Sequence, residues 1–227
     1  MYNPASMNQP SFELVIFDCD GVLVDSEPLA NRIIVEMMGE YGYQVNEAEF
    51  LREFSGTTLP YREKTIAQKL GWTPPQNFLA ELSHRLETRA ANELQPIPHA
   101  RELIESLNTP VCVASNGNRA EIGLRLQVAG LTDLIGGRIF SATEVAHPKP
   151  APDVYLAAAK AFGVSPSQCI VVEDSVPGVT AAIRAGMRVY GHAVLTNEES
   201  LREAGASPFF SMLELKDILA REHSLVQ

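Results

Sequence analysis

Short apolar runs that alternate with helical patterns restrict the fold of this chain more than any other feature of its sequence. The apolar runs lie at residues 12–17, 110–114, 138–141, 169–172 and 188–190. Between them, apolar residues recur at helical spacing at 99–107, 119–129, 153–162 and 176–185. Such alternation is typical of βαβ units, in which helices connect parallel strands. Strands that are apolar throughout favour a sheet covered on both faces, so we predict an α/β fold with a parallel-sheet core.

The alternation is interrupted once, by a long stretch that shows helical patterns and no strand pattern. These helical patterns lie at 28–41, 47–54, 59–70 and 76–94. The second predicted strand therefore begins about 90 residues after the first, far beyond an ordinary crossover. We predict a small helical domain at 28–96, inserted into a core formed by 12–27 and 97–227, with residues 1–11 as a flexible tail. Pro96 and Pro98 mark the return to the core, since proline favours an extended linker.

Charge and composition disfavour several classes of partner. The net charge of −10 argues against nucleic acid and against anionic membrane surfaces. No run approaches the roughly 20 apolar residues that span a bilayer, and the N-terminus lacks the pattern of a secretory signal. Cys19, Cys112 and Cys169 lie in or beside apolar runs without zinc-ligand spacing, as buried thiols of a reducing cytosol do. We expect a cytoplasmic protein with no obligatory protein partner.

Polar residues gather directly after the predicted strands. The segments are Asp18-Cys19-Asp20-Gly21, Ser115-Asn116-Gly117 and Glu173-Asp174-Ser175, and Lys149 lies between the last two in the chain. Because the carboxyl ends of parallel strands meet at one edge of a sheet, these segments should converge there. Crowded carboxylates call for a cation, and oxygen ligands together with a phosphate suit Mg²⁺. A carboxylate nucleophile, a second aspartate and a lysine would serve phosphoryl transfer.

Each of these segments also has a structural explanation when it is taken alone. Asp20-Gly21 is a turn signal, and Ser115-Asn116-Gly117 is a common turn. Asp174 or Ser175 would cap the following helix, and a lysine between two prolines is usually solvated. Their shared position at the ends of successive strands favours the functional interpretation over four unrelated turns.

In sequence, F-D-C-D-G-V-L-V-D-S resembles the first motif of haloacid dehalogenase-like hydrolases. V-C-V-A-S-N-G resembles their second motif, H-P-K-P-A-P-D-V-Y their third and V-V-E-D-S their fourth. The match runs from residue 13 to about 220 with order and spacing intact. The resemblance implies a Rossmann-like core with an α-helical cap inserted after the first motif.

The resemblance also implies roles for the motif residues. Asp18 would be the nucleophile and a Mg²⁺ ligand, and Asp20 the general acid and base, with its backbone carbonyl on the metal. Asp174 would be a further metal ligand and Glu173 a direct or water-mediated one. The phosphoryl group would be bound by the following residues: Ser115, Lys149 and the backbone near Asn116 and Gly117.

The reaction class follows from details of the motifs. Asp20 disfavours a dehalogenase, since those members lack it, and the cap lysines Lys64 and Lys69 look solvated, which disfavours a phosphonatase. Beta-phosphoglucomutases carry a histidine where this chain has Ala30 and a lysine where it has Ser55. We therefore expect a phosphatase acting on a small phosphorylated metabolite, with a sugar phosphate favoured. A beta-phosphoglucomutase-like phosphotransferase and a non-catalytic module that binds phosphate and Mg²⁺ remain as alternatives.

Substrate contacts are expected mainly from the cap. A loop containing Ser55, Gly56 and Thr57 joins two predicted cap helices, and its small residues would let it approach a ligand closely. Further candidate contacts are Glu27, Asn118 and Arg119.

Overall fold

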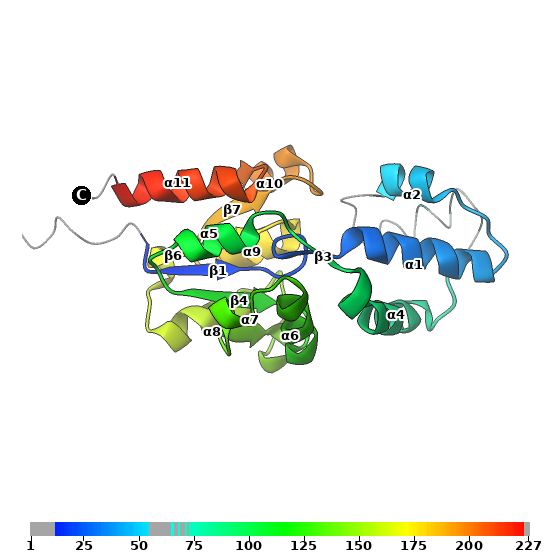
Figure 1. The fold of residues 1–227 in the computed structure, drawn as a ribbon, viewed down its shortest axis with the longest axis horizontal. Coiled ribbons are helices and arrows are strands. Elements are labelled where there is room, and N and C mark those ends of the chain that lie inside the picture. Colours follow the sequence, from blue (N-terminus) through cyan, green and yellow to red (C-terminus); the bar gives the residue numbers. More distant parts are fainter. Residues whose placement is uncertain (1–11, 55–64, 66–67, 69–70, 72, 225–227) are drawn as a thin grey trace, which may run out of the picture. The chain divides into compact units, whose positions relative to one another are not determined.

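The computed structural model describes residues 12–54, 65, 68, 71 and 73–224. The chain forms two compact units (Figure 1). The core unit comprises Met1–Val24 and Pro96–Gln227, and the helical unit comprises Asp25–Gln95. The two segments that join them, β2 (Val24–Asp25) and β3 (Gln95–Pro96), pair as a short two-stranded sheet.

The core unit is built on a six-stranded sheet in the order β5-β4-β1-β6-β7-β8, in which all neighbouring strands are parallel. The strands are β1 (Leu14–Phe17), β4 (Val111–Ser115), β5 (Ile139–Ser141), β6 (Cys169–Glu173), β7 (Arg188–His192) and β8 (Ser207–Phe209). Strand β1 lies in the middle of the sheet, where Val15 is paired with Val111 on one side and Ile170 on the other. The predicted α/β fold with a parallel, Rossmann-like sheet is confirmed.

Helices cover both faces of this sheet (Figure 1). They are α5 (Ala100–Ser106), α6 (Arg119–Val128), α7 (Thr132–Ile135), α8 (Asp153–Phe162), α9 (Val176–Arg184), α10 (Glu198–Ala204) and α11 (Met212–Ser224). Two short 3₁₀ turns, η2 (Ala142–Glu144) and η3 (Pro166–Gln168), precede α8 and β6.

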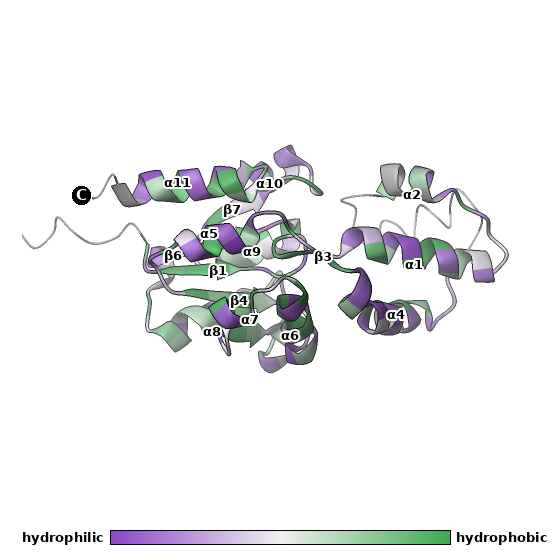
Figure 2. Cartoon of the chain, viewed as in Figure 1, coloured by the Kyte–Doolittle hydropathy of each residue, from purple (hydrophilic) through white to green (hydrophobic). Residues whose placement is uncertain are grey.

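Strand β1 contributes to two separate hydrophobic clusters, one on each face of the sheet. Val15 and Phe17 belong to the cluster that includes side chains of α5, α6 and α11. Leu14 and Ile16 belong to the cluster that includes side chains of α8 and α9. This is why the strand is apolar at every position, and Figure 2 shows β1 and β4 as hydrophobic along their length. A fully buried side chain of this kind contributes about 1.5–3 kcal/mol.

In the helical unit, α1 (Glu27–Glu40), α2 (Glu47–Phe54) and α4 (Phe78–Glu93) are described. Helix α1 buries Leu29, Ile33 and Met37, which lie on one face at helical spacing. The rings of Phe50 and Phe54 on α2 are 4.5 Å apart. Most of the helix predicted at 59–70 lies outside the described residues.

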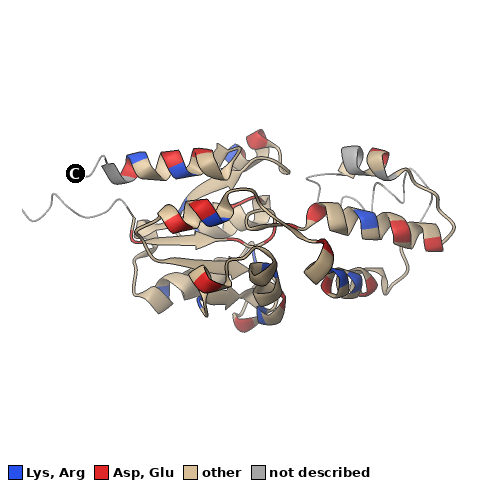
Figure 3. Cartoon of the chain, in the orientation of Figure 1, with Lys and Arg blue, Asp and Glu red and all other residues tan. Residues whose placement is uncertain are grey.

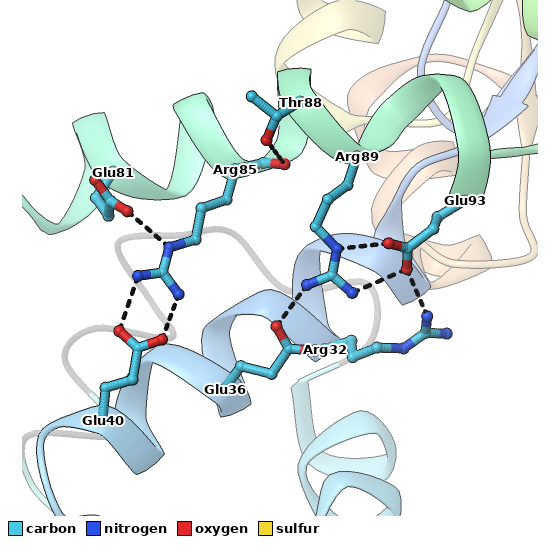
Figure 4. A network of polar contacts seen from close by, with 8 residues as sticks. All are labelled: Arg32, Glu36, Glu40, Glu81, Arg85, Thr88, Arg89 and Glu93. Carbon is cyan, nitrogen blue, oxygen red and sulfur yellow. Dashed lines mark hydrogen bonds and ion pairs between the residues drawn. The ribbon is translucent and has the colours of Figure 1, made fainter.

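Charged residues of both signs lie along α1 and α4 (Figure 3), and their side chains join the two helices (Figure 4). Arg85 donates two hydrogen bonds to Glu40, at 2.6 and 2.8 Å, and one to Glu81 at 2.7 Å. Arg89 bridges Glu36 and Glu93 in the same way. These pairs are largely exposed, so solvent screening leaves each of them only a small contribution to the packing of the two helices.

No helix among the described residues is both long and apolar enough to cross a membrane. Cys19, Cys112 and Cys169 are all buried and unpaired, as their apolar surroundings in the sequence predict.

Candidate active site

The loop after β1 places two aspartates at the carboxyl edge of the sheet. Asp18 directly follows the strand, donates its backbone N–H to Val172 of β6 at 2.9 Å and is 7% exposed. The chain then turns at Gly21, which has a φ of 72°. A Cβ at this position would lie 2.0 Å from Oδ2 of Asp174. Glycine is therefore needed here both for the backbone conformation and for the close approach of the fourth motif.

His192 supports this loop from the end of β7. Its Nδ1–H donates to the carbonyl of Gly21 at 2.8 Å, and its ring stacks on Phe209 with centroids 5.1 Å apart. The buried imidazole thus ties the first motif to the neighbouring part of the sheet.

The second motif forms a closed turn between β4 and α6. The buried hydroxyl of Ser115 accepts the N–H of Gly117 at 3.2 Å, and Ser141 of β5 donates to the carbonyl of Gly117 at 2.6 Å. Asn116 accepts the backbone N–H of Lys149 at 3.1 Å, which joins the second motif to the third. Asn118 begins α6 as the N-cap residue of a capping box.

Lys149 occupies the centre of the cluster. Its Nζ donates to Oδ1 of Asp18 at 2.6 Å, to Oε1 of Glu173 at 2.7 Å and to the carbonyl of Ala114 at 3.0 Å. It also lies 4.8 Å from the centre of the Tyr155 ring. Burial alone would lower the pKa of Lys149, but the two carboxylates outweigh it and raise the pKa well above its ordinary value. The ammonium group therefore remains charged.

Glu173 is fully buried and accepts hydrogen bonds on both oxygens. Oε1 accepts from Lys149 and from the hydroxyl of Tyr155, the latter at 2.8 Å. Oε2 accepts the N–H of Asp174 and both the N–H and the hydroxyl of Ser175. Burial would raise the pKa of Glu173, but Lys149 outweighs it and the pKa is lowered. A Cβ on Gly178 would lie 1.7 Å from Oε1, so α9 can approach Glu173 only with glycine at that position.

The carboxylates of Asp18, Glu173 and Asp174 form a candidate metal site. Each offers an oxygen, and these atoms lie within 4.8 Å of one another. Burial, opposed by Lys149 and reinforced by Glu173, raises the pKa of Asp18 from 3.8 to about 7. Burial, together with Glu173 and Asp18, raises the pKa of Asp174 well above its ordinary value. Two carboxylates that are destabilised in this way fit a divalent cation, which would relieve both.

The remaining candidates for substrate contacts fall into two groups: residues with local partners in the structure, and residues whose contact with a substrate stays a prediction. Arg119 is paired with Glu144 at 2.8 Å, and the side chain of Asn118 caps α6, so both have local structural roles. Glu27 is the first residue of α1 and belongs to the helical unit, so its contact with a substrate stays a prediction. The candidate loop residues Ser55, Gly56 and Thr57 lie outside the described residues.

Three residues near the site were not among the sequence candidates: Tyr155, His192 and Arg125. Tyr155 is the last residue of the third motif, H-P-K-P-A-P-D-V-Y, and this position is the sequence feature that could have indicated it as a site residue. Arg125 donates from Nε to Oδ1 of Asp20 at 2.9 Å. Neither Arg125 nor His192 has a local sequence pattern that indicates its partner.

Comparisons with known proteins agree with this arrangement. The model of the haloacid dehalogenase-like hydrolase family matches residues 12–186. The chain is 33% identical over 180 residues to 6-phosphogluconate phosphatase of Escherichia coli (strain K12), covering 78% of this chain and 81% of that protein. It is 29% identical over 175 residues to fructose-1-phosphate phosphatase of the same organism, with 76% and 92% covered. Two further relatives are longer proteins, and the matched region covers 19% and 54% of their lengths.

A solved structure from the same family also resembles this chain. The haloacid dehalogenase family hydrolase of Deinococcus radiodurans R1, solved with bound phosphate and sodium, is 32% identical with a TM-score of 0.80, and the match covers 94% of this chain and 97% of that one. The chain belongs to the haloacid dehalogenase-like hydrolase family. Within that family it is a phosphoric monoester hydrolase.

Proposed function

We propose that this protein is a Mg²⁺-dependent phosphatase that hydrolyses a small phosphorylated metabolite, with sugar phosphates as the substrate class, through an aspartyl-phosphate. The observation that carries the proposal is the geometry of Asp18. Lys149 holds its Oδ1 at 2.6 Å, while the side chain remains 10% exposed at the edge of the sheet. A carboxylate fixed through one oxygen can attack phosphorus with the other.

The first half of the reaction transfers the phosphoryl group to the protein. An oxygen of Asp18 forms a bond to phosphorus while the ester oxygen of the substrate leaves. Asp20 gives its proton to that leaving oxygen, which then departs as an alcohol. The closed turn of Ser115, Asn116 and Gly117 adjoins the site through Lys149 and binds the phosphoryl oxygens.

The second half returns the protein to its starting state. Asp20, now ionised, takes a proton from water, and the water oxygen attacks phosphorus. The bond between phosphorus and Asp18 breaks, and inorganic phosphate is released. The same residue thus serves as acid and then as base, which splits a difficult hydrolysis into two easier steps.

Asp18 and Asp174 would hold the Mg²⁺, which would neutralise charge on the phosphoryl oxygens. Glu173 is a weaker candidate for direct binding because its two oxygens already accept five hydrogen bonds from protein donors. We propose that it acts on the site indirectly, by fixing Lys149 and the turn that carries Asp174.

Sugar phosphates are proposed because two relatives are named for such substrates. The helical unit is proposed to act as the cap that selects among them, through the loop containing Ser55, Gly56 and Thr57. If the substitution Gly56→Arg left the substrate profile unchanged, this role of the loop would be abandoned.

The test is phosphate release from p-nitrophenyl phosphate and from a panel containing 6-phosphogluconate and fructose 1-phosphate, with Mg²⁺ and with EDTA. Wild type should turn over at least one sugar phosphate, with a requirement for Mg²⁺, and Asp18→Asn should be inactive. Asp133→Asn is a matched control, because Asp133 is an exposed partner of Arg101 and belongs to none of the four motifs. Trapping of phosphate on Asp18 by mass spectrometry tests the intermediate.

Two outcomes would contradict the proposal. Activity that persists in Asp18→Asn would exclude the aspartyl-phosphate. A wild type that is inert towards the whole panel would favour a phosphotransferase or a non-catalytic module, and conversion of glucose 1-phosphate would then distinguish these two.

A further inference from the structure

The side chain of Asp20 has a fixed partner on α6. Nε of Arg125 donates to Oδ1 of Asp20 at 2.9 Å, across 105 positions of the chain. The Arg125 side chain is 19% exposed and that of Asp20 is 35% exposed. An aspartate with this exposure would otherwise be able to change its side-chain rotamer, so the arginine restricts its orientation.

Arg125 is itself held in place by the start of α6. Glu121, one helical turn earlier, accepts the N–H of Asn118 at 2.8 Å in the capping box. Oε2 of Glu121 lies 3.8 Å from Nη1 of Arg125. The guanidinium group also lies beside the phosphate-binding turn, since a Cβ on Gly117 would be 3.6 Å from Nη1. Arg125 therefore connects the turn proposed to bind the phosphoryl group with the aspartate proposed to move the proton.

This connection matters because a general acid must lie within hydrogen-bond reach of the oxygen that it protonates. Arg125 engages Oδ1 of Asp20, which leaves Oδ2 to carry the proton. The backbone around Asp20 is fixed separately, by the hydrogen bond from Gly21 to Val24 at 2.8 Å. The remaining freedom of Asp20 is rotation of its carboxyl group, and this is the freedom that Nε removes.

We propose that Arg125 is a positioning residue for this phosphatase, which orients the carboxyl group of Asp20 so that Oδ2 faces the leaving-group oxygen of the substrate. The proposal rests on the proposed role of Asp20 as general acid and base. Two other roles are outcomes of the test: an ion pair that only stabilises the core unit, and a direct contact of Arg125 with the phosphoryl group.

Leaving groups of different basicity separate these roles. The p-nitrophenolate ion leaves readily without a proton, whereas the alkoxide of a sugar phosphate needs one. The experiment therefore measures kcat and kcat/KM for p-nitrophenyl phosphate, phenyl phosphate and the best sugar phosphate. The ratio kcat/KM reports the steps up to departure of the leaving group, whereas kcat also includes hydrolysis of the aspartyl-phosphate, which is common to all three substrates. The variants are Arg125→Met, Arg125→Lys, Asp20→Asn and the double variant Arg125→Met/Asp20→Asn, with thermal unfolding of each as a check on folding. Arg202→Met is the matched control, because Arg202 forms an exposed ion pair with Glu198 on α10.

We expect Arg125→Met to lower kcat/KM for the sugar phosphate by about 10- to 100-fold and that for p-nitrophenyl phosphate by less than about 3-fold. Asp20→Asn should show the same dependence on the leaving group, and the double variant should be no worse than Asp20→Asn. Arg125→Lys should recover part of the loss, because lysine can donate to the same oxygen. Arg202→Met should match wild type.

Several results would overturn the proposal. Equal losses of kcat/KM for all three substrates would mean that Arg125 does not act on the departure of the leaving group. A higher KM for all of them with kcat unchanged would mean that it binds the phosphoryl group. Additive losses in the double variant would show that Arg125 does not act through Asp20. If Asp20→Asn itself showed no dependence on the leaving group, the acid role of Asp20 in the proposed function would fail first, and this inference with it.

Discussion

Replacement of Lys149 by methionine should destabilise the metal-free protein strongly and in a pH-dependent way. All three protons of the ammonium group are used, by Asp18, Glu173 and the carbonyl of Ala114. The side chains of Lys149, Asp18 and Glu173 are 4%, 10% and 0% exposed. Methionine retains the approximate length of the side chain but removes the charge, so two buried carboxylates lose their counter-ion.

Two estimates give the same magnitude. Removal of one partner from a buried ion pair typically destabilises a protein by about 3–5 kcal/mol. The variant can limit the loss by binding a proton on Glu173, whose ordinary pKa is 4.5. Keeping such a carboxyl group protonated at pH 7.5 costs about 4 kcal/mol, and at pH 5.5 about 1.4 kcal/mol.

The sign of the pH dependence follows from Glu173. In wild type its pKa is lowered, so its contribution to stability is present above pH 4.5 and is lost as the pH falls through the folded-state pKa. In the variant its pKa is raised, so its contribution is present below pH 4.5 and is lost as the pH rises. The difference in the free energy of unfolding between the two proteins should therefore widen from pH 5.5 to pH 7.5.

The assay is urea unfolding in EDTA at both pH values, followed by circular dichroism. Lys216→Met is the matched control, because Lys216 forms an exposed pair with Glu102 at 2.7 Å, and its replacement should change stability only slightly at either pH. A destabilisation below about 1 kcal/mol at pH 7.5, or one that does not change with pH, would refute the view that Lys149 compensates buried carboxylates.

Three further predictions concern other contacts. Gly21→Ala would place a Cβ 2.0 Å from Asp174 and should raise the Mg²⁺ concentration for half-maximal activity by at least about 10-fold in a Mg²⁺ titration; an unchanged value would count against Asp174 as a ligand. Tyr155→Phe removes one hydrogen bond to buried Glu173 and should lower the free energy of unfolding by about 1–2 kcal/mol in urea; a change near zero would show that the other donors suffice. Arg89→Met should lower the melting temperature slightly at low salt and hardly at all in molar NaCl, since the ion pairs it breaks are partly exposed; equal shifts in both would indicate lost packing.

The sequence predicts the central strands well because burial on both faces makes each of them apolar throughout. Strand β8 was missed for the opposite reason: Ser207–Phe209 lies at the edge of the sheet and contains a proline, so it has no extended apolar run. The predicted positions of the polar segments follow from the same logic, since each begins where a strand ends. The structure brings Asp18 and Glu173 to Lys149, which hydrogen-bonds to both. The positions of the two carboxylates at strand ends lead one to expect their convergence, whereas Lys149 lies in the loop before α8.

Partners that come from the middle of a helix could not be predicted in this way. Arg125 meets Asp20 because α6 packs into the same hydrophobic cluster as Val15 and Phe17 of β1, and nothing near residue 125 indicates this. His192, at the end of β7, could not be predicted either, because its hydrogen bond to Gly21 joins residues 171 positions apart in the chain. Asn118 and Arg119 have local partners in the structure, and their contact with a substrate stays a prediction.

Folding of the core sheet depends on how soon distant parts of the chain meet. Val15 pairs with Val111 and Ile170, which are 96 and 155 positions further along the chain. Closing loops of this length slows folding, because chain entropy is lost before the contacts form. When β2 pairs with β3, the two ends of the helical unit become neighbours, and the loop between β1 and β4 is shortened by the length of that unit. A helical unit that forms early therefore speeds assembly of the sheet, and substitutions that weaken it should also slow refolding of the core.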